Sequence, residues 1–288
     1  MQKMMMGKNH GVESSGQSGG KIGSDSSPFD SFPLDCISKI VSFTSPRDAC
    51  VAATVSKAFE SAAKSDVVWE KFLPPEYASL VPSSRHFSSK KVLYFAFCEE
   101  PLLIDDGTKS FWLEKASGKR CLMLSAMNIS IIWGDTPQYW KWISIPEARF
   151  KSVAKLRHVC WFEIRGRVKT RVLSPKTRYS AYLVFKKTDS CYGFDDVAVE
   201  AGVGVVGHEA STRTICFETD VDNEREMRWI YPEERKDGWM EVDLGEFFNG
   251  EEMMNGDEIE MSALETRDLG WKRGLIIQGI EIRPAKIQ

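Results

Sequence analysis

The stretch that decides the fold reads Phe32-Pro33-Leu34-Asp35-Cys36-Ile37-Ser38-Lys39-Ile40-Val41, and short apolar segments follow it up to Phe72. Ile37, Ile40 and Val41 recur at spacings of three and four residues, which places them on one face of a helix. Pro33 precedes this helix, where its fixed φ and its missing N–H do no harm. The stretch is too short to be stable alone, so we expect it to pack against further surface.

More helices are expected directly after this one. Ser45-Pro46-Arg47-Asp48 is a helix-start signal, because a capping serine, a proline at the first position and an acid three residues later form a capping box. Asp66 is a candidate cap for a third helix that carries Trp69 and Phe72. We therefore predict a bundle of three short helices with an exposed apolar lip at residues 32–34, the kind of patch that marks a partner site. The alternative is an ordinary bundle whose apolar residues all face its own core.

The order of these features resembles the F-box family. A proline-containing lip, an Ile-Val helix, a Ser-Pro-Arg-Asp turn, a Val-Ser-x-x-Phe segment and a late tryptophan follow one another between Phe32 and Leu73. The resemblance implies docking on a Skp-type adaptor, which joins the chain to the cullin and RING subunits of a ubiquitin ligase. It assigns adaptor binding to Phe32, Pro33, Leu34, Ile37, Ile40 and Val41. It leaves Val55 and Trp69 to hold the bundle together.

Length and charge restrict the classes of function. A chain of 288 residues has room for about two domains, and 42% apolar residues is enough for a core. A net charge of −3 and a pI near 5.9 argue against a phosphate-binding surface, so nucleic acid is not expected as a ligand. The seven cysteines are scattered, which favours free thiols in a reducing compartment over disulfides or a zinc site. We expect no metal, no cofactor and no membrane partner, since no apolar run approaches the roughly 20 residues of a membrane span.

The sequence pattern divides the chain into four segments. Residues 1–27 are rich in Gly and Ser and poor in large apolar residues, so we expect a disordered tail. Residues 28–75 are assigned to the F-box, and residues 76–108 to a helical linker in which Ser88 to Cys98 is predicted to be a helix. Residues 109–287 are assigned to a β-sandwich.

The prediction of a sandwich depends on a change of period after Phe111. Every second residue from Tyr179 to Phe185 is one that sheets commonly bury: Tyr179, Ala181, Leu183 and Phe185. Ile276, Ile280 and Ile282 are likewise separated by even numbers of residues, which predicts that they face the same side of a strand. Many short strands separated by turn residues are typical of antiparallel sandwiches. The expected fold class is therefore multi-domain α plus β, with a small helical bundle followed by an antiparallel β-sandwich.

One loop of the second domain is unusually aromatic. Three tryptophans and a tyrosine fall within residues 133–142, around a Gly-Asp-Thr-Pro turn. Turn segments lie on the surface, and aromatic rings there offer flat apolar faces that suit the C–H face of a sugar ring. The alternative is that Trp133, Trp140 and Trp142 pack between the sheets.

This loop also carries a second resemblance. With Val159 to Gly166, Leu173 to Tyr179, Asp237 to Glu241, Leu244 to Phe248 and Gly279 to Pro284, it resembles the phloem lectin family, also called Nictaba-like. The resemblance covers residues 109–285 and implies a lectin-like domain that binds N-acetylglucosamine oligomers or N-glycan cores. It carries the sugar-binding roles onto Trp133, Trp140, Glu258 and Glu265. Glu258 fits the outward face of a strand, whereas Glu265 breaks the alternation.

Two signals for chemistry are rejected. Residues 202–207 fit the dinucleotide pattern Gly-x-Gly-x-x-Gly, but a dinucleotide site needs a helix after it, and His208 to Asp220 is predicted to be a loop and then a strand. We therefore interpret residues 202–207 as a flexible loop. The carboxylates Glu258 and Glu260 suggest a glycosidase pair, but nothing else supports catalysis, and a solvated strand face explains them. We expect no catalytic residue.

The expected function is substrate recognition for a Skp–cullin–F-box E3 ubiquitin ligase, with a target protein, glycosylated or not, held by the sandwich. Two alternatives stay open. The chain could be a cytosolic lectin whose bundle is structural, or the sandwich could bind a protein surface and not a sugar. We expect the protein in the cytoplasm and leave the nucleus open as a second compartment.

Overall fold

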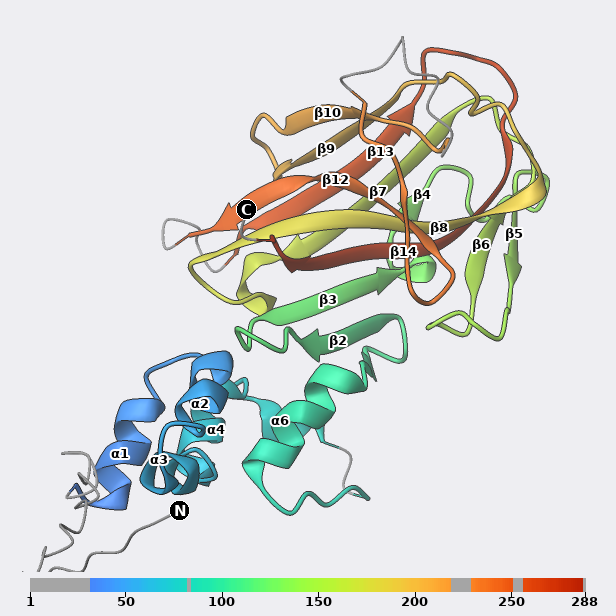
Figure 1. Cartoon of the computed structure of the whole chain (residues 1–288). Helices are drawn as coiled ribbons and strands as arrows, with labels where there is room; N and C mark the ends of the chain where they lie inside the picture. Colours follow the sequence, from blue (N-terminus) through green and yellow to red (C-terminus); the bar gives the residue numbers. More distant parts are fainter. Residues whose placement is uncertain (1–31, 82–83, 219–228, 251–255, 287–288) are drawn as a thin grey trace, which may run out of the picture.

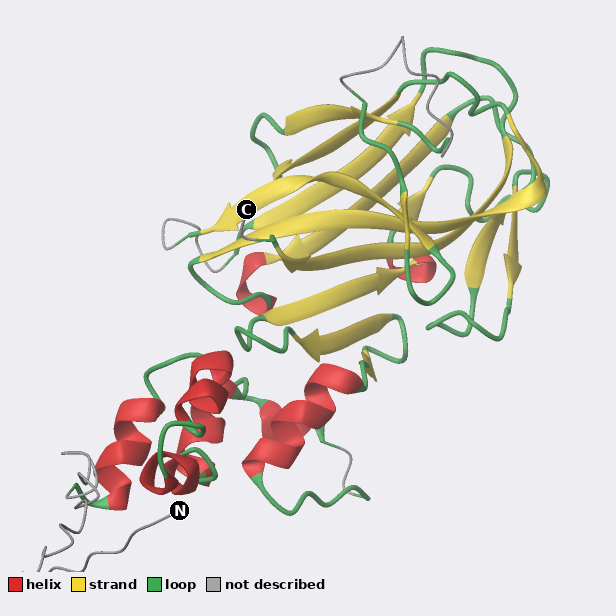
Figure 2. Ribbon diagram, in the orientation of Figure 1, coloured by secondary structure: helices red, strands yellow, loops and turns green. Residues whose placement is uncertain are grey.

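A group of helices and a larger antiparallel sandwich make up the chain (Figure 1). The computed structural model describes residues 32–81, 84–218, 229–250 and 256–286, and the tail predicted for residues 1–27 lies outside them. Figure 2 shows that the helices gather on one side of the molecule and the strands on the other. The predicted fold class is confirmed, with helices first and two antiparallel sheets after them. No helix in the described ranges is long and apolar enough to cross a membrane.

Serine caps define the helices of the bundle. The Asp48 N–H donates to Ser45 Oγ at 3.1 Å, which confirms the predicted serine cap. The Asp48 carboxylate accepts from the Ser45 hydroxyl at 2.8 Å and not from the Ser45 backbone N–H, so the two residues form half of the predicted capping box. Ser65 and not Asp66 caps the last helix of the bundle, because its hydroxyl accepts from the Val67 N–H. A further helix separates these two, so the bundle has one helix more than the three predicted. The helical segments are α1 Leu34–Val41, α2 Pro46–Ala52, α3 Lys57–Ala62, α4 Asp66–Phe72, α5 Tyr77–Leu80 and α6 Lys90–Glu99, with short 3-10 turns at Ala126–Asn128 and Thr170–Val172.

Trp69 fills the centre of the bundle. Its side chain is fully buried, and its indole N–H donates to the Ala63 carbonyl at 2.6 Å, so the polar edge is satisfied inside the core. Ile37 and Val41 of α1 face this core. Val55 does not, although we predicted that it would: it lies in the turn before Ser56 caps α3 and is 70% exposed.

The bundle and the sandwich share one hydrophobic cluster. Phe97 of α6 and Phe111 of β2 are both buried, and their rings meet edge to face with centroids 6.3 Å apart. The Tyr94 hydroxyl donates to the carbonyls of the β2–β3 turn at Glu114 and Lys115, 3.2 and 3.1 Å away. The segment expected as a linker therefore supplies, in α6, part of a core that joins the two parts.

Two antiparallel sheets face each other across the main core. The larger has the strand order β1-β2-β3-β14-β8-β12-β11, with β6 pairing to β14 and β5 to β6; the smaller has the order β10-β9-β13-β7-β4. Tyr179, Ala181, Leu183 and Phe185 of β8 are all fully buried between the sheets, as their alternation predicts. The strands are β1 Leu102–Ile104, β2 Lys109–Leu113, β3 Arg120–Ser125, β4 Ser130–Ile131, β5 Trp140–Ile143, β6 Val153–Leu156, β7 Phe162–Lys169, β8 Thr177–Tyr192, β9 Val199–Val205, β10 Ser211–Ile215, β11 Glu233–Glu234, β12 Met240–Asn249, β13 Glu258–Glu265 and β14 Arg273–Pro284.

A bulge in β14 changes the predicted alternation of that strand. The register shifts between Ile277 and Gly279, so Ile280 faces the main core while Ile276 packs on the outer face near Trp239. Gly279 has a φ of +155°, and a Cβ there would lie 1.9 Å from the Leu124 carbonyl oxygen. Only glycine fits this approach, and the predicted common parity of Ile276 and Ile280 was wrong because periodicity does not reveal a bulge.

The glycine-rich segment expected to be a flexible loop forms a strand. Gly202 and Gly204 lie in β9, which pairs with β10 and with β13. A Cβ at Gly204 would come within 2.7 Å of the Ala210 Cα, so glycine here permits close packing in the hairpin. The strand β10 follows this segment, as the predicted loop and strand after residue 207 imply.

The shared cluster gives a stability prediction. Phe97→Ala removes the ring that joins α6 to β2, and we expect it to lower the free energy of unfolding by about 3 to 5 kcal/mol. Val92→Ala is the matched control, because Val92 lies on the same helix but is 47% exposed, and it should cost less than about 1 kcal/mol. Urea unfolding followed by circular dichroism measures both. Equal losses for the two variants would contradict the shared core.

Candidate functional site

Helix α1 buries one side and exposes the other. Ile37 and Val41 are 1% and 2% exposed and belong to the bundle core, while Leu34 and Ile40 are 48% and 50% exposed. Phe32 and Pro33, just before the helix, are also exposed. The structure therefore leaves four of the six predicted adaptor-binding positions on the surface and places Ile37 and Val41 where they can act only by supporting the helix.

The exposed side of α1 continues beyond the predicted residues. Pro33, Cys36, Ile40 and Phe43 recur at spacings of three and four, and all four are exposed, with Phe43 at 75%. The Lys39 ammonium lies 5.3 Å from the centroid of the Phe43 ring. We call the exposed residues the α1 apolar surface: Phe32, Pro33, Leu34, Cys36, Ile40 and Phe43. Sequence reasoning missed Cys36 and Phe43, although their helical spacing from Ile40 was a usable signal.

The two tryptophans predicted to bind sugar lie in different environments. Trp140 is 1% exposed, belongs to the main core and donates its indole N–H to the Ile132 carbonyl at 3.0 Å. Trp133 is 38% exposed, and its ring centroid lies 5.0 Å from that of Tyr139. Trp142 is 36% exposed and donates to the Gly134 carbonyl at 2.9 Å. Trp133 and Trp142 therefore offer exposed rings, whereas Trp140 supports the loop from inside.

Trp133 adopts an unusual backbone conformation. Its φ is +52°, in the left-handed region, where a bulky side chain is a genuine outlier. Such strain costs on the order of 1 to 3 kcal/mol and clusters at ligand-binding sites. The conformation sits in the turn that Gly134 closes by donating its N–H to the Ile131 carbonyl at 3.0 Å.

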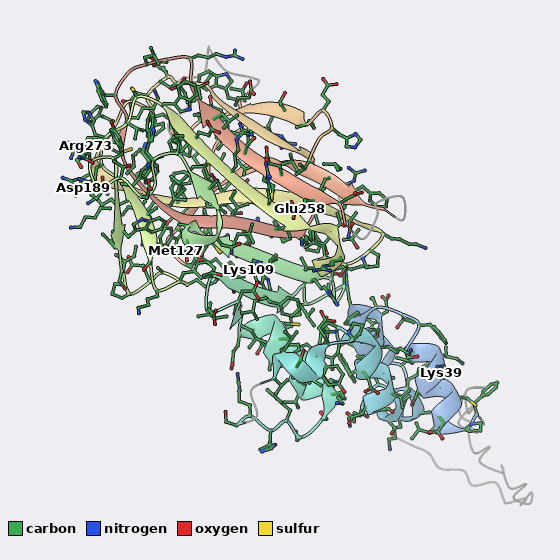
Figure 3. The ribbon with its side chains drawn as sticks, turned by 180° about the vertical axis from the view of Figure 1, so that it is seen from behind. Lys39, Lys109, Met127, Asp189, Glu258 and Arg273 are labelled. Atoms are coloured by element: carbon green, nitrogen blue, oxygen red, sulfur yellow. The ribbon has the colours of Figure 1, made fainter. Side chains whose placement is uncertain are left out.

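Glu258 and Glu265 stand at opposite ends of β13. They are seven steps apart along the strand, a distance of about 23 Å at about 3.3 Å per residue. Trp133 belongs to the Glu265 end, because its neighbour Ile132 donates to the carbonyl of Glu163, which pairs with Leu264. Figure 3 labels Glu258 far from Arg273, which begins β14 at the other end of the sandwich. The structure does not bring Glu258 and Trp133 together.

Glu265 is buried and organises the loop that follows it. It shares the inward parity of Ile259 and Met261, is 3% exposed and forms an ion pair with fully buried Lys272. Its Oε1 also accepts from the backbone N–H groups of Arg267 and Asp268 at 3.0 and 2.7 Å. These contacts satisfy the carboxylate inside the protein, so Glu265 shapes the loop rather than presenting an oxygen to solvent.

Four exposed tryptophans gather at this end of the sandwich. Residues 159 and 272 form a bridge, which brings Trp161 and Trp271 to the same end as Trp133. Trp271 stacks on His158 with centroids 4.3 Å apart. We call this group the aromatic end: Trp133, Trp142, Trp161 and Trp271. Sequence reasoning missed Trp271, for which the only signal was its place in a Gly-Trp turn.

One ionised carboxylate accompanies these rings. Trp161 donates its indole N–H to Glu163 Oε2 at 3.0 Å, and Arg165 donates to Glu163 Oε1 at 2.7 Å. The hydrogen bonds from Arg165 and then Trp161 hold the pKa of Glu163 below its ordinary value. A charged acceptor beside exposed rings suits a ligand with hydroxyl or amide donors. The described parts of the chain bring no three side chains of His, Cys, Asp or Glu together in a way that could hold a metal ion.

Comparisons with known proteins identify both parts. The F-box domain family matches residues 29–71, and the family described as Phloem protein 2 matches residues 119–284. F-box protein PP2-B10 of Arabidopsis thaliana is 70% identical, over 93% of this chain and 98% of the relative. F-box protein SKIP3 of the same organism is 57% identical, over 91% of this chain and 90% of the relative. The chain belongs to the phloem protein 2 family and carries an F-box domain ahead of the domain that defines that family.

Proposed function

We propose that this chain is the substrate-recognition subunit of a Skp–cullin–F-box ubiquitin ligase. The observation that carries the proposal is the α1 apolar surface, which stands exposed on a domain that matches the F-box family. Exposed contiguous apolar side chains on a soluble domain mark an interaction site. A Skp-type adaptor is the partner that the family implies, and the cullin and RING subunits follow through the adaptor.

The chain would act by positioning and not by bond chemistry. The shared cluster of α6 and β2 holds the bundle and the sandwich in one arrangement, in which Lys39 of α1 and Arg273 of β14 lie at opposite ends of the molecule (Figure 3). A target held at the far end would stay at a high effective concentration near the ubiquitin-loaded enzyme. Under this proposal the chain binds the adaptor and the target in the cytoplasm, with the nucleus open as a second compartment.

For the sandwich we propose target binding at the aromatic end, with N-glycan cores or N-acetylglucosamine oligomers as ligands. Exposed rings and the ionised Glu163 support this choice, because they match the apolar face and the hydroxyl rim of a sugar. Trp133 is the predicted residue best placed for contact, while Trp140 and Glu265 would act as supports. Glu258 stays a predicted sugar-binding residue only if the sugar chain is long enough to extend along β13.

The second candidate function is that the sandwich binds a protein surface, and the exposed tryptophans favour this function as well. Tryptophan is enriched among the residues that dominate protein–protein binding. A sugar site with few stacked rings often reaches only about millimolar affinity, roughly −4 kcal/mol, which is weak for selecting a target. A cytosolic lectin without a ligase role would bind the sugar equally well but leave the α1 apolar surface without a partner.

The ligase role is tested at α1. Leu34→Ala with Ile40→Ala removes two exposed apolar side chains, each expected to cost about 2 kcal/mol of adaptor binding, or about 30-fold in affinity. Val92→Ala on α6 is the control, because it removes a similarly exposed apolar side chain from another helix. Co-purification with a Skp-type adaptor and calorimetric titration measure the loss. Wild-type affinity in the double variant would overturn the assignment of this surface.

The ligand role is tested at Trp133. Trp133→Gly relieves the left-handed backbone strain by about 1 kcal/mol, which offsets part of the lost ring packing, so we expect the variant to stay folded with a lowered melting temperature. Binding to chitin oligomers should fall at least tenfold in a titration. Phe248→Ala is the control, because Phe248 is 51% exposed on β12, away from the aromatic end. A well-folded Trp133→Gly variant with unchanged oligosaccharide binding would remove Trp133 from the site.

A further inference from the structure

A groove lies beside the aromatic end, between the β5–β6 hairpin and the strand ends where β8 and β14 pair. Its volume is about 890 Å³, within the range of sites that hold a ligand. None of the described residues that line it is acidic. The charged and aromatic side chains that line it are Trp140, Lys141, Trp142, Lys155, Arg157, His158, Tyr192 and Arg273.

The four permanent cations of this groove have no carboxylate partner among the described residues. Arg157 donates to the Pro137 carbonyl at 3.0 Å and Arg273 to Ser190 Oγ at 3.4 Å, both neutral acceptors. Several arginines elsewhere in the sandwich do have carboxylate partners: Arg213 pairs with Asp243 at 3.1 Å and Arg165 with Glu260 at 2.7 Å. Asp189 is exposed on β8, three residues before Tyr192, the register partner of Arg273, and it forms no ion pair with Arg273. The groove is therefore a concentrated patch of unneutralised positive charge.

The strand register places two of these cations directly opposite each other. Lys141 of β5 pairs with Lys155 of β6, and like charges in that position destabilise a sheet. Arg157 follows Lys155 by two residues, which directs it to the same side of an extended segment. A lysine on an edge strand such as β5 can serve to discourage strand pairing. That reason does not apply to Lys155, because β6 is paired on both sides, to β5 and to β14.

Aromatic contacts hold the wall of the groove in a fixed shape. His158 stacks on Trp271 and hydrogen-bonds Tyr192 Oη at 2.8 Å. The Arg273 guanidinium lies 5.7 Å from the centroid of the Tyr192 ring. Because the rings are held before any ligand arrives, binding would order few further side chains.

We propose that this basic groove binds an acidic peptide segment of the target protein, through carboxylate or phosphate groups. The charge of the groove requires an anionic ligand, and the whole chain carries a net charge of −3, which disfavours a long polyanion such as nucleic acid. Among the described residues no strand pairs with the outer edge of β5, so its backbone groups beyond Trp140, whose N–H already donates to the Thr136 carbonyl at 3.1 Å, can pair with an extended peptide. Lys141 on this strand would disfavour pairing with a basic or neutral strand, and acidic side chains of a bound peptide would remove that penalty. The inference deepens the proposed function, since it gives the target-holding sandwich a protein segment to recognise beside any sugar.

Fluorescence polarisation with the purified full chain tests the groove. The probes are a short labelled peptide of alternating Glu and Ser, the same peptide with Gln for Glu, its phosphoserine form, a single-stranded oligothymidylate and a sulfated disaccharide. We expect the Glu peptide or the phosphoserine peptide to bind at least tenfold tighter than the Gln peptide, and the affinity to fall as salt rises. The better of the two acidic peptides identifies the anionic group.

Paired variants assign the binding to this groove. Lys155→Gln with Arg157→Gln should weaken acidic-peptide binding at least tenfold. Lys169→Gln with Lys236→Gln, which removes two exposed lysines elsewhere, should leave it within twofold. Unchanged binding in the groove variant, or tighter binding of oligothymidylate or the sulfated sugar than of either acidic peptide, would overturn the proposal. Adaptor co-purification of the same variant, expected at wild-type level, separates failure of this groove from failure of the ligase role.

Discussion

Phe97 and Tyr94 of α6 pack with Phe111 and Leu113 of β2 in the same hydrophobic cluster that contains Trp69. This packing means that the bundle does not complete its core alone, and that the first hairpin of the sandwich needs the helices. The Arg120–Glu76 ion pair, 2.8 Å long, and the hydrogen bond from the Arg47 N–H to the Ala116 carbonyl tie the same two parts at the surface of the join. A helical bundle of this size is marginal by itself, so the shared core explains how it stays folded while one side of α1 remains exposed.

The shared core fixes the position of the α1 apolar surface relative to the aromatic end. The α1 apolar surface lies at one extremity of the molecule, and the aromatic end with the basic groove lies across the sandwich from it (Figure 1). Because Ile37 and Val41 anchor the buried side of α1, the exposed side is held in one orientation. At the other end, the buried Lys272–Glu265 pair and the stacked His158 and Trp271 hold the loops that carry the exposed rings. Under the proposed function, this rigidity would confine a bound target to a smaller volume than a flexible arrangement of the same surfaces would.

Features that depend on neighbouring residues in the chain could be predicted from the sequence. The helix cap at Ser45, the inward residues of β8 and the exposed lip at the start of α1 follow from spacing and cap preference alone. The sequence could not predict what long-range pairing controls: the bulge at Gly279, the burial of Trp140 beside exposed Trp133, and the solvent exposure of Val55 all depend on neighbours distant in the chain. The basic groove could not be predicted either, because its cations come from the separate segments β5, β6 and β14. The negative net charge of the chain also gave no sign of a basic surface.

The account claims that α6 and β2 belong to one cooperative unit, and amide hydrogen exchange tests this most directly. Exchange followed by mass spectrometry reports the free energy of opening for α6 and for β2 separately. We predict that the slowest amides of the two elements open with the same free energy, within about 1 kcal/mol, and that Phe97→Ala lowers both together. A helix α6 that exchanges far faster than β2, and that responds to Phe97→Ala while β2 does not, would contradict a shared core.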